Sequence, residues 1–96
     1  MSTTVGTRVP DELAHDIDYL ASEEQQDTSK VLRTIVTKGV RDKLVELALA
    51  KYARHEVSMG RGAELARIPL AEFLRKAAEQ KIPLNYTLQD LEEDLA

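Results

Sequence analysis

Cysteine is absent from the sequence, which excludes disulfide bridges, thiolate metal sites and cysteine nucleophiles together. Tryptophan is absent too, and the only aromatic residues are three Tyr and one Phe. The apolar residues are instead mainly Leu, Ile, Val and Ala, which suit helices packed on helices. No apolar run is long enough to span a bilayer. Residues 1–9 lack the charged start and the apolar stretch of a secretory signal, so we expect a cytoplasmic protein.

The residues of common catalytic sites are sparse. His15 and His55 are the only histidines, and no ligand-like spacing surrounds either of them. The acidic pairs at 23–24 and 92–93 are adjacent in sequence, so their side chains project in different directions on a helix. Residues 60–62 (Gly-Arg-Gly) are too short for a phosphate-binding loop. We therefore expect no enzymatic activity, no metal site and no cofactor.

Charge is distributed unevenly along the chain. The net charge is −4, which by itself argues against a nucleic-acid partner. Residues 30–43, however, contain five basic residues against the single acid Asp42, whereas acidic residues gather in 11–24 and 90–94. Salt screens charges over about 8–10 Å, so a basic patch on an acidic protein can still bind phosphate locally.

The periodicity predicts one short strand followed by helices. Residues 3–9 alternate, with Val5 and Val9 on one face, and Pro10 closes the strand and opens a helix. Helices are predicted over residues 11–24, from Thr28 or Ser29 to about residue 55, and over 58–66, 69–81 and 87–95. The spacing leaves open whether the second of these helices is continuous through Gly39 or consists of two helices that meet there. We divide the chain into residues 1–55 and residues 56–96.

A single strand cannot satisfy its own backbone hydrogen bonds. The simplest remedy is the same strand of a second copy, which predicts a homodimer with a two-stranded ribbon that fits the major groove of double-stranded DNA. The order of residues 4–10 (TVGTRVP) and 28–30 (TSK) resembles the ribbon-helix-helix family of Arc, MetJ and CopG, and its antitoxin members most closely. This resemblance covers the first half of the chain.

The resemblance implies a mainly α-helical, dimeric ribbon-helix-helix fold with a helical C-terminal extension. It also implies a DNA site, in which the ribbon reads base edges and the start of the second long helix holds a phosphate. The implied DNA-binding residues are Thr4, Gly6, Arg8, Thr28, Ser29 and Lys30. Gly6 has no side chain, so direct readout would depend on Arg8 and Thr4. Each of these features also has an interpretation without DNA. Thr4 and Arg8 are then exposed strand residues, Thr28 and Ser29 are ordinary helix caps, and the basic residues of 30–43 form a solvated helix face.

The second half of the chain has a pattern of its own. Residues 58–74 have the rhythm of a helix-turn-helix, with Arg67 where a turn glycine is usual. Residues 48–52 and 82–95 are similar to a small prokaryotic family whose members are regarded as antitoxin partners of PIN-type nucleases. This similarity implies a module that binds a ribonuclease toxin, and the apolar candidates for that contact are Leu84, Tyr86, Leu88, Leu91 and Leu95. Two alternatives remain: residues 58–96 complete a helical core, or they form a second DNA-reading unit.

Together these patterns predict a homodimeric type II antitoxin that represses transcription at its own operator and binds a PIN-type ribonuclease toxin. The alternative is a protein-interaction module, or a transcription factor, that has no toxin partner.

Overall fold

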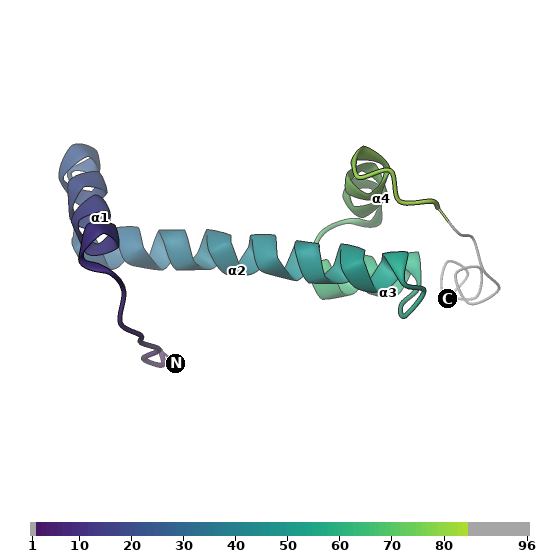
Figure 1. Cartoon of the computed structure of the whole chain (residues 1–96), viewed down its shortest axis with the longest axis horizontal. Coiled ribbons are helices and arrows are strands. Elements are labelled where there is room, and N and C mark those ends of the chain that lie inside the picture. The colour runs from purple at the N-terminus through teal and green to yellow at the C-terminus, as the bar shows by residue number, and fades with distance from the viewer. Residues whose placement is uncertain (1, 85–96) are drawn as a thin grey trace. The chain divides into compact units, whose positions relative to one another are not determined.

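The computed structural model of the chain describes residues 2–84 and consists of α-helices joined by short turns (Figure 1). The helices are α1 (Asp11–Glu24), α2 (Thr28–Ala53), α3 (Met59–Ala66) and α4 (Leu70–Glu79). Four of the predicted helices are therefore confirmed, and their bounds differ from the predicted ones by at most two residues. The fifth, predicted over residues 87–95, lies outside the described residues.

The predicted N-terminal strand is wrong. Residues 2–10 form no strand, and no strand occurs anywhere between residues 2 and 84. The ribbon-helix-helix fold class, which required that strand, is overturned with it. The physical reason is that alternation describes only where side chains point, whereas a strand also needs a neighbouring backbone to take its hydrogen bonds. The described part of this chain offers no such neighbour.

The chain divides into two compact units, residues 1–37 and 38–96. The first unit contains α1 and the start of α2, and the second contains the rest of α2 together with α3 and α4. The predicted boundary between residues 55 and 56 lies in the turn between α2 and α3. That boundary stays a prediction about how function is divided along the chain.

Helix α2 settles the alternative left open at Gly39, because it is one continuous helix of 26 residues. A Cβ atom built on Gly39 would meet no atom within 4 Å, so packing inside the chain does not require glycine there. The helix begins at Thr28, and the Val31 N–H donates to the Asp27 carbonyl at 3.0 Å. Residues 28–30 thus form the first turn of α2.

The second unit has a well-formed core. Helix α2 contributes residues at i, i+3, i+4 and i+7 spacing (45, 48, 49 and 52), which share one face of the helix. Phe73 of α4 is fully buried, and its ring meets the Tyr52 ring edge-on with centroids 5.6 Å apart. The buried residues of this core are Ala48, Leu49, Tyr52, Met59, Ala63, Ala66, Phe73 and Ala77. Half-buried apolar side chains surround them, so α2, α3 and α4 close on one interior.

The helix ends share an unusual backbone feature. Each of the four helices is followed within two residues by a non-glycine residue at positive φ, namely Gln25, His55, Arg67 and Lys81. The backbone N–H of each of these residues donates to a carbonyl oxygen in the last turn of the preceding helix. In addition, the Gln26 N–H donates to the Ala21 carbonyl at 3.0 Å, and the Ile68 N–H donates to the Ala63 carbonyl at 3.2 Å. Glycine is the residue that usually occupies the left-handed position of such a cap.

Candidate nucleic-acid interface

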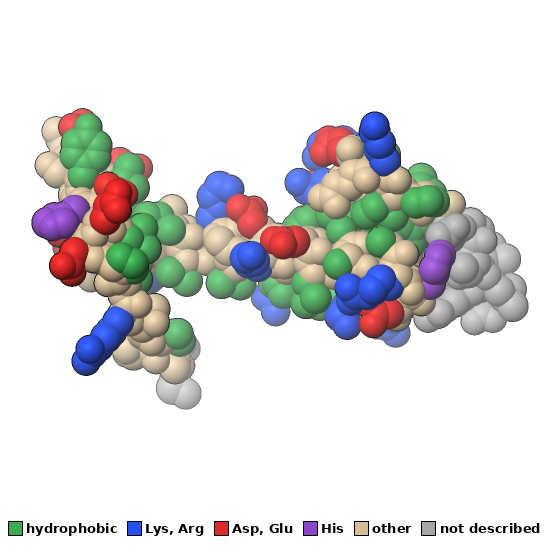
Figure 2. All heavy atoms as spheres, in the orientation of Figure 1, with side chains coloured by type: hydrophobic (Ala, Val, Ile, Leu, Met, Phe, Trp, Pro, Cys, Tyr) green, Lys and Arg blue, Asp and Glu red, His purple; other side chains and the backbone are tan. Residues whose placement is uncertain are grey.

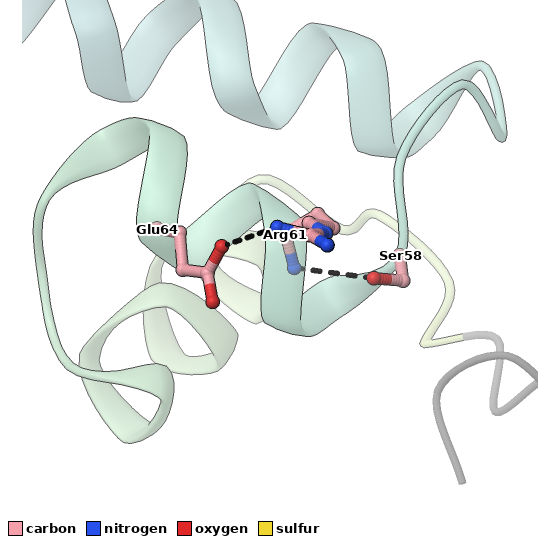
Figure 3. A network of polar contacts seen from close by, with 3 residues as sticks. All are labelled: Ser58, Arg61 and Glu64. Atoms are coloured by element: carbon pink, nitrogen blue, oxygen red, sulfur yellow. Dashed lines mark hydrogen bonds and ion pairs between the residues drawn. The ribbon is translucent and has the colours of Figure 1, made fainter. Parts of the chain in front are cut away.

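Helix α3 begins at a buried serine. Ser58 is 6% exposed, and its hydroxyl oxygen accepts a hydrogen bond from the Arg61 N–H at 3.1 Å (Figure 3). This bond satisfies one of the N–H groups that the first turn of a helix leaves without a partner. On the exposed side of the same helix, the Arg61 guanidinium lies 3.0 Å from the Glu64 carboxylate. The predicted capping role of Ser58 is confirmed, and it fixes where α3 starts.

A turn of three residues connects α3 to α4. Arg67 adopts the left-handed conformation, with φ 60° and ψ 40°, and ends α3. Pro69 is extended and precedes α4, and its carbonyl accepts from the Phe73 N–H at 3.0 Å. Two helices joined by a turn of three or four residues form a helix-turn-helix. The sequence pattern placed Arg67 at the usual glycine position, and the structure shows that this residue takes the backbone conformation that glycine favours.

Close contact between α3 and α4 depends on a glycine that the sequence analysis did not single out for packing. A Cβ atom on Gly62 would lie 2.5 Å from Cζ and 2.9 Å from Cε2 of Phe73. The Phe73 ring therefore lies directly against the backbone of α3. The sequence did contain a signal. Gly62 stands inside a short predicted helix, and because glycine lowers helix propensity, its presence there indicates a packing reason.

The exposed surface of α4 carries a cation suited to nucleic acid. Arg75 lies 2.8 Å from Glu79 and 3.9 Å from Glu72, and its side chain is 60% exposed. Exposed ion pairs of this kind contribute little to stability, about 0–1 kcal/mol, so the guanidinium can exchange these carboxylates for another acceptor. Arg67, in the turn before α4, and Lys81, two residues after α4, are exposed. Neither of them forms an ion pair among residues 2–84.

Positive charge is concentrated in the stretch of chain that contains the helix-turn-helix. Residues 38–84 include ten Lys or Arg and six Asp or Glu, a net charge of +4 with His neutral. Residues 2–37 include three Lys or Arg and seven Asp or Glu, a net charge of −4. Residues 85–96 add four acids and no Lys or Arg, so the net charge of the second unit as a whole is zero and its positive charge lies in residues 38–84. A net positive stretch can attract the phosphate backbone of nucleic acid locally, because salt screens more distant charges.

The residues that the sequence assigned to DNA form two separate sets. Thr4, Gly6 and Arg8 are exposed and precede α1 without belonging to any helix. Residues 28–30 (Thr, Ser and Lys) are exposed in the first turn of α2. No hydrogen bond or ion pair among the described residues joins the two sets. The structure therefore does not assemble them into the predicted ribbon-and-clamp site.

The residues assigned to a protein partner fall almost entirely outside the described residues. Leu84 is the exception, and its side chain is 53% exposed. Those that lie outside are Tyr86, Leu88, Leu91 and Leu95. Within residues 2–84, no group of three or more His, Cys, Asp or Glu is placed to hold a metal ion. None of the helices in that range has the length and hydropathy needed to cross a membrane.

Comparison with known proteins identifies relatives but no structural template, since no solved structure matches the chain. A UPF0175 protein from Archaeoglobus fulgidus is 33% identical over 66 residues, which are 62% of this chain and 76% of that protein. A UPF0175 protein from Aeropyrum pernix is 37% identical over 51 residues, which are 53% of this chain and 57% of that protein. The family described as "Uncharacterised protein family (UPF0175)" matches residues 1–96. The chain therefore belongs to the UPF0175 family.

Proposed function

We propose that this protein is a non-catalytic, DNA-binding transcriptional regulator that acts as a type II antitoxin. The observation that carries the proposal is the helix-turn-helix of α3 and α4 within residues 38–84, a stretch with a net charge of +4. Helix α4 takes the place of the recognition helix, and helix α3 crosses the phosphate backbone. Double-stranded DNA is the partner, because the major groove admits an α-helix of this kind.

Base reading in this proposal comes from the outer face of α4. In a helix-turn-helix, the N-terminal residues of the second helix meet the base edges. Glu72 and Arg75 lie there with side chains that are 40% and 60% exposed. An arginine pairs with guanine O6 and N7 through two hydrogen bonds, and a glutamate accepts from cytosine N4. Arg67, in the turn before α4, and Lys81, just after α4, supply phosphate contacts.

The predicted DNA-binding residues of the N-terminal part contribute less to this site than α4 does. Residues 28–30 remain candidates for a phosphate contact, since the first turn of α2 presents N–H groups next to Lys30. In this proposal the regulator binds as a homodimer, because two copies related by a two-fold axis read two half-sites. Strand pairing does not support that dimer, because residues 2–84 contain no strand.

Substitution of Arg75 tests the DNA-binding proposal. We expect Arg75→Ala to weaken binding to the specific operator by about 1–3 kcal/mol and to relax the preference at one base position. Binding is measured by fluorescence anisotropy over a range of salt concentrations, with DNA from the promoter of the protein's own gene. The matched control is Arg54→Ala, which removes one charge from the same unit outside α4 and is expected to leave base preference intact. Unchanged affinity and base preference in Arg75→Ala would remove α4 from the DNA site.

A toxin partner is the second part of the proposal. Its support is the similarity of residues 82–95 to antitoxin-like proteins paired with PIN-type nucleases. The spacing of Leu84, Leu88, Leu91 and Leu95 gives a narrow apolar stripe of the kind that anchors a helix in a groove. Four acids in residues 90–94 complement a basic RNA-binding surface.

We expect the full-length protein to co-purify with the nuclease encoded by the adjacent gene and to inhibit its cleavage of RNA. A variant with both Leu88→Asp and Leu91→Asp is expected to lose at least about tenfold in affinity, since each change places a charge on the apolar stripe. The control Gln89→Asp adds a charge away from the stripe and leaves α3 and α4 intact. Equal inhibition by the double variant and by the control would contradict this contact.

A further inference from the structure

The unit formed by residues 2–37 has a very small interior. Among its described residues, only Ala21 and Val31 are buried. Helices of this length gain most of their stability from packing an apolar face against another element. One alanine and one valine provide little of that packing. The first unit therefore needs more apolar burial than it contains.

The missing burial is present on the surface of the same unit. Five large apolar side chains of α1 and of the first turns of α2 are between 41% and 53% exposed (Figure 2). We call them the apolar surface of the first unit, and they are Leu13, Leu20, Leu32, Ile35 and Val36. Exposed apolar surface shared by two adjoining elements marks an interaction site more often than isolated exposed residues do.

The charges of this unit indicate what covers the apolar surface. Helix α1 contains six acidic residues and no Lys or Arg. Residues 28–37 of α2 contain Lys30 and Arg33 and no acid. None of these eight side chains forms an ion pair within the described residues. A surface that carries an acidic helix next to a basic segment can pair with a second copy of itself. In that pair the acidic helix of each copy faces the basic segment of the other, so the charges are complementary.

We propose that a second copy of this chain covers the apolar surface of the first unit, with α1 of one copy packed along the start of α2 of the other. A two-fold axis makes this contact twice, because the same surface serves both copies. Each acidic α1 then lies near Lys30 and Arg33 of the partner. The dimer itself does not depend on the proposed function. Only its consequence rests on that function, namely that two α4 helices bind two DNA half-sites.

Sedimentation equilibrium of the full-length protein tests the dimer. We expect a mass twice the 10.8 kDa of one chain, with a melting temperature that rises with protein concentration. Val36→Asp and Leu20→Asp each place a charge on the apolar surface and are expected to weaken the dimer at least about tenfold. Tyr19→Asp is the matched control on α1. Tyr19 lies about 100° around the helix from Leu20 and about 120° from Leu13, and the control is expected to stay dimeric.

Arg33→Glu provides a variant that leaves the apolar surface intact. It is expected to weaken the dimer and to retain wild-type helix content by circular dichroism, because it reverses one charge opposite the acidic helix. This variant decides the matter if the apolar substitutions unfold the chain. A folded wild-type monomer of 10.8 kDa at all concentrations would overturn the inference, and so would wild-type association of the folded Arg33→Glu variant.

The dimer and the DNA-binding function fail in different ways. A dimer that binds no operator DNA would leave the inference standing and end the proposed function. A monomer whose operator binding is lost in Arg75→Ala would overturn the dimer, in this inference and in the proposed function alike, and leave DNA binding through α4 standing.

Discussion

Phe73→Ala is expected to lower the free energy of unfolding by about 3–5 kcal/mol, the range typical of removing a large buried aromatic side chain. Phe73 is the only phenylalanine of the chain and is fully buried, so its loss leaves a cavity where α2, α3 and α4 meet. The change also removes the edge-on contact with the Tyr52 ring. Net stabilities of folded domains are only about 5–15 kcal/mol, so we expect much of the second unit to unfold at physiological temperature.

Chemical denaturation followed by circular dichroism measures this loss. Phe73→Leu, which keeps an apolar side chain at the same site, is the conservative control and is expected to lose less stability. Operator binding is expected to fall with the folded fraction in both variants, because α4 cannot present Arg75 once its core contact is gone. A Phe73→Ala protein with the wild-type denaturation midpoint would show that the core does not depend on this ring.

Gly62→Ala is expected to destabilise the second unit by about 1–3 kcal/mol, although alanine favours helices more than glycine does. The added methyl group would lie 2.5 Å from Cζ of Phe73, and a fully buried ring has no open space into which to move. Steric overlap therefore outweighs the gain of about 1 kcal/mol in helix propensity.

Gly39→Ala is the matched control, because no atom lies within 4 Å of the Cβ it would add. It is expected to leave stability unchanged or to raise it. The double variant Gly62→Ala, Phe73→Leu tests the cause, since two residues in contact show a coupling energy that distant residues lack. Additive losses in the double variant would mean that the methyl group does not meet the ring.

The helices could be predicted from the sequence because their signals are local. Apolar residues recur at helical spacing, Ser58 can cap from its own position, and Pro69 marks the start of α4. The strand could not be decided in the same way. Alternation in residues 3–9 is also local, but the backbone pairing that makes a strand depends on a second segment that the described chain lacks.

The two helical glycines show why the site was only partly predictable. Gly39 and Gly62 both interrupt helical patterns, and sequence alone gives them the same meaning. In the structure Gly39 has open space beside it, whereas Gly62 allows the Phe73 ring to contact the backbone of α3. The difference depends on which helix lies opposite, which is a property of tertiary packing. The excess of basic residues in 38–84 is hidden in the net charge of the chain, because the acids of residues 11–27 and 90–94 offset it.

The left-handed residues at the helix ends bear on how long the protein persists in a cell. Gln25, His55, Arg67 and Lys81 each hold a conformation that costs a residue with a side chain about 1 kcal/mol. Helix ends weakened in this way open more often, and an opened backbone is the substrate of cellular proteases. Small losses in stability change the amount of a protein in cells several-fold. We therefore expect these four residues to shorten the lifetime of the protein in a cell relative to a variant with glycine at the same positions.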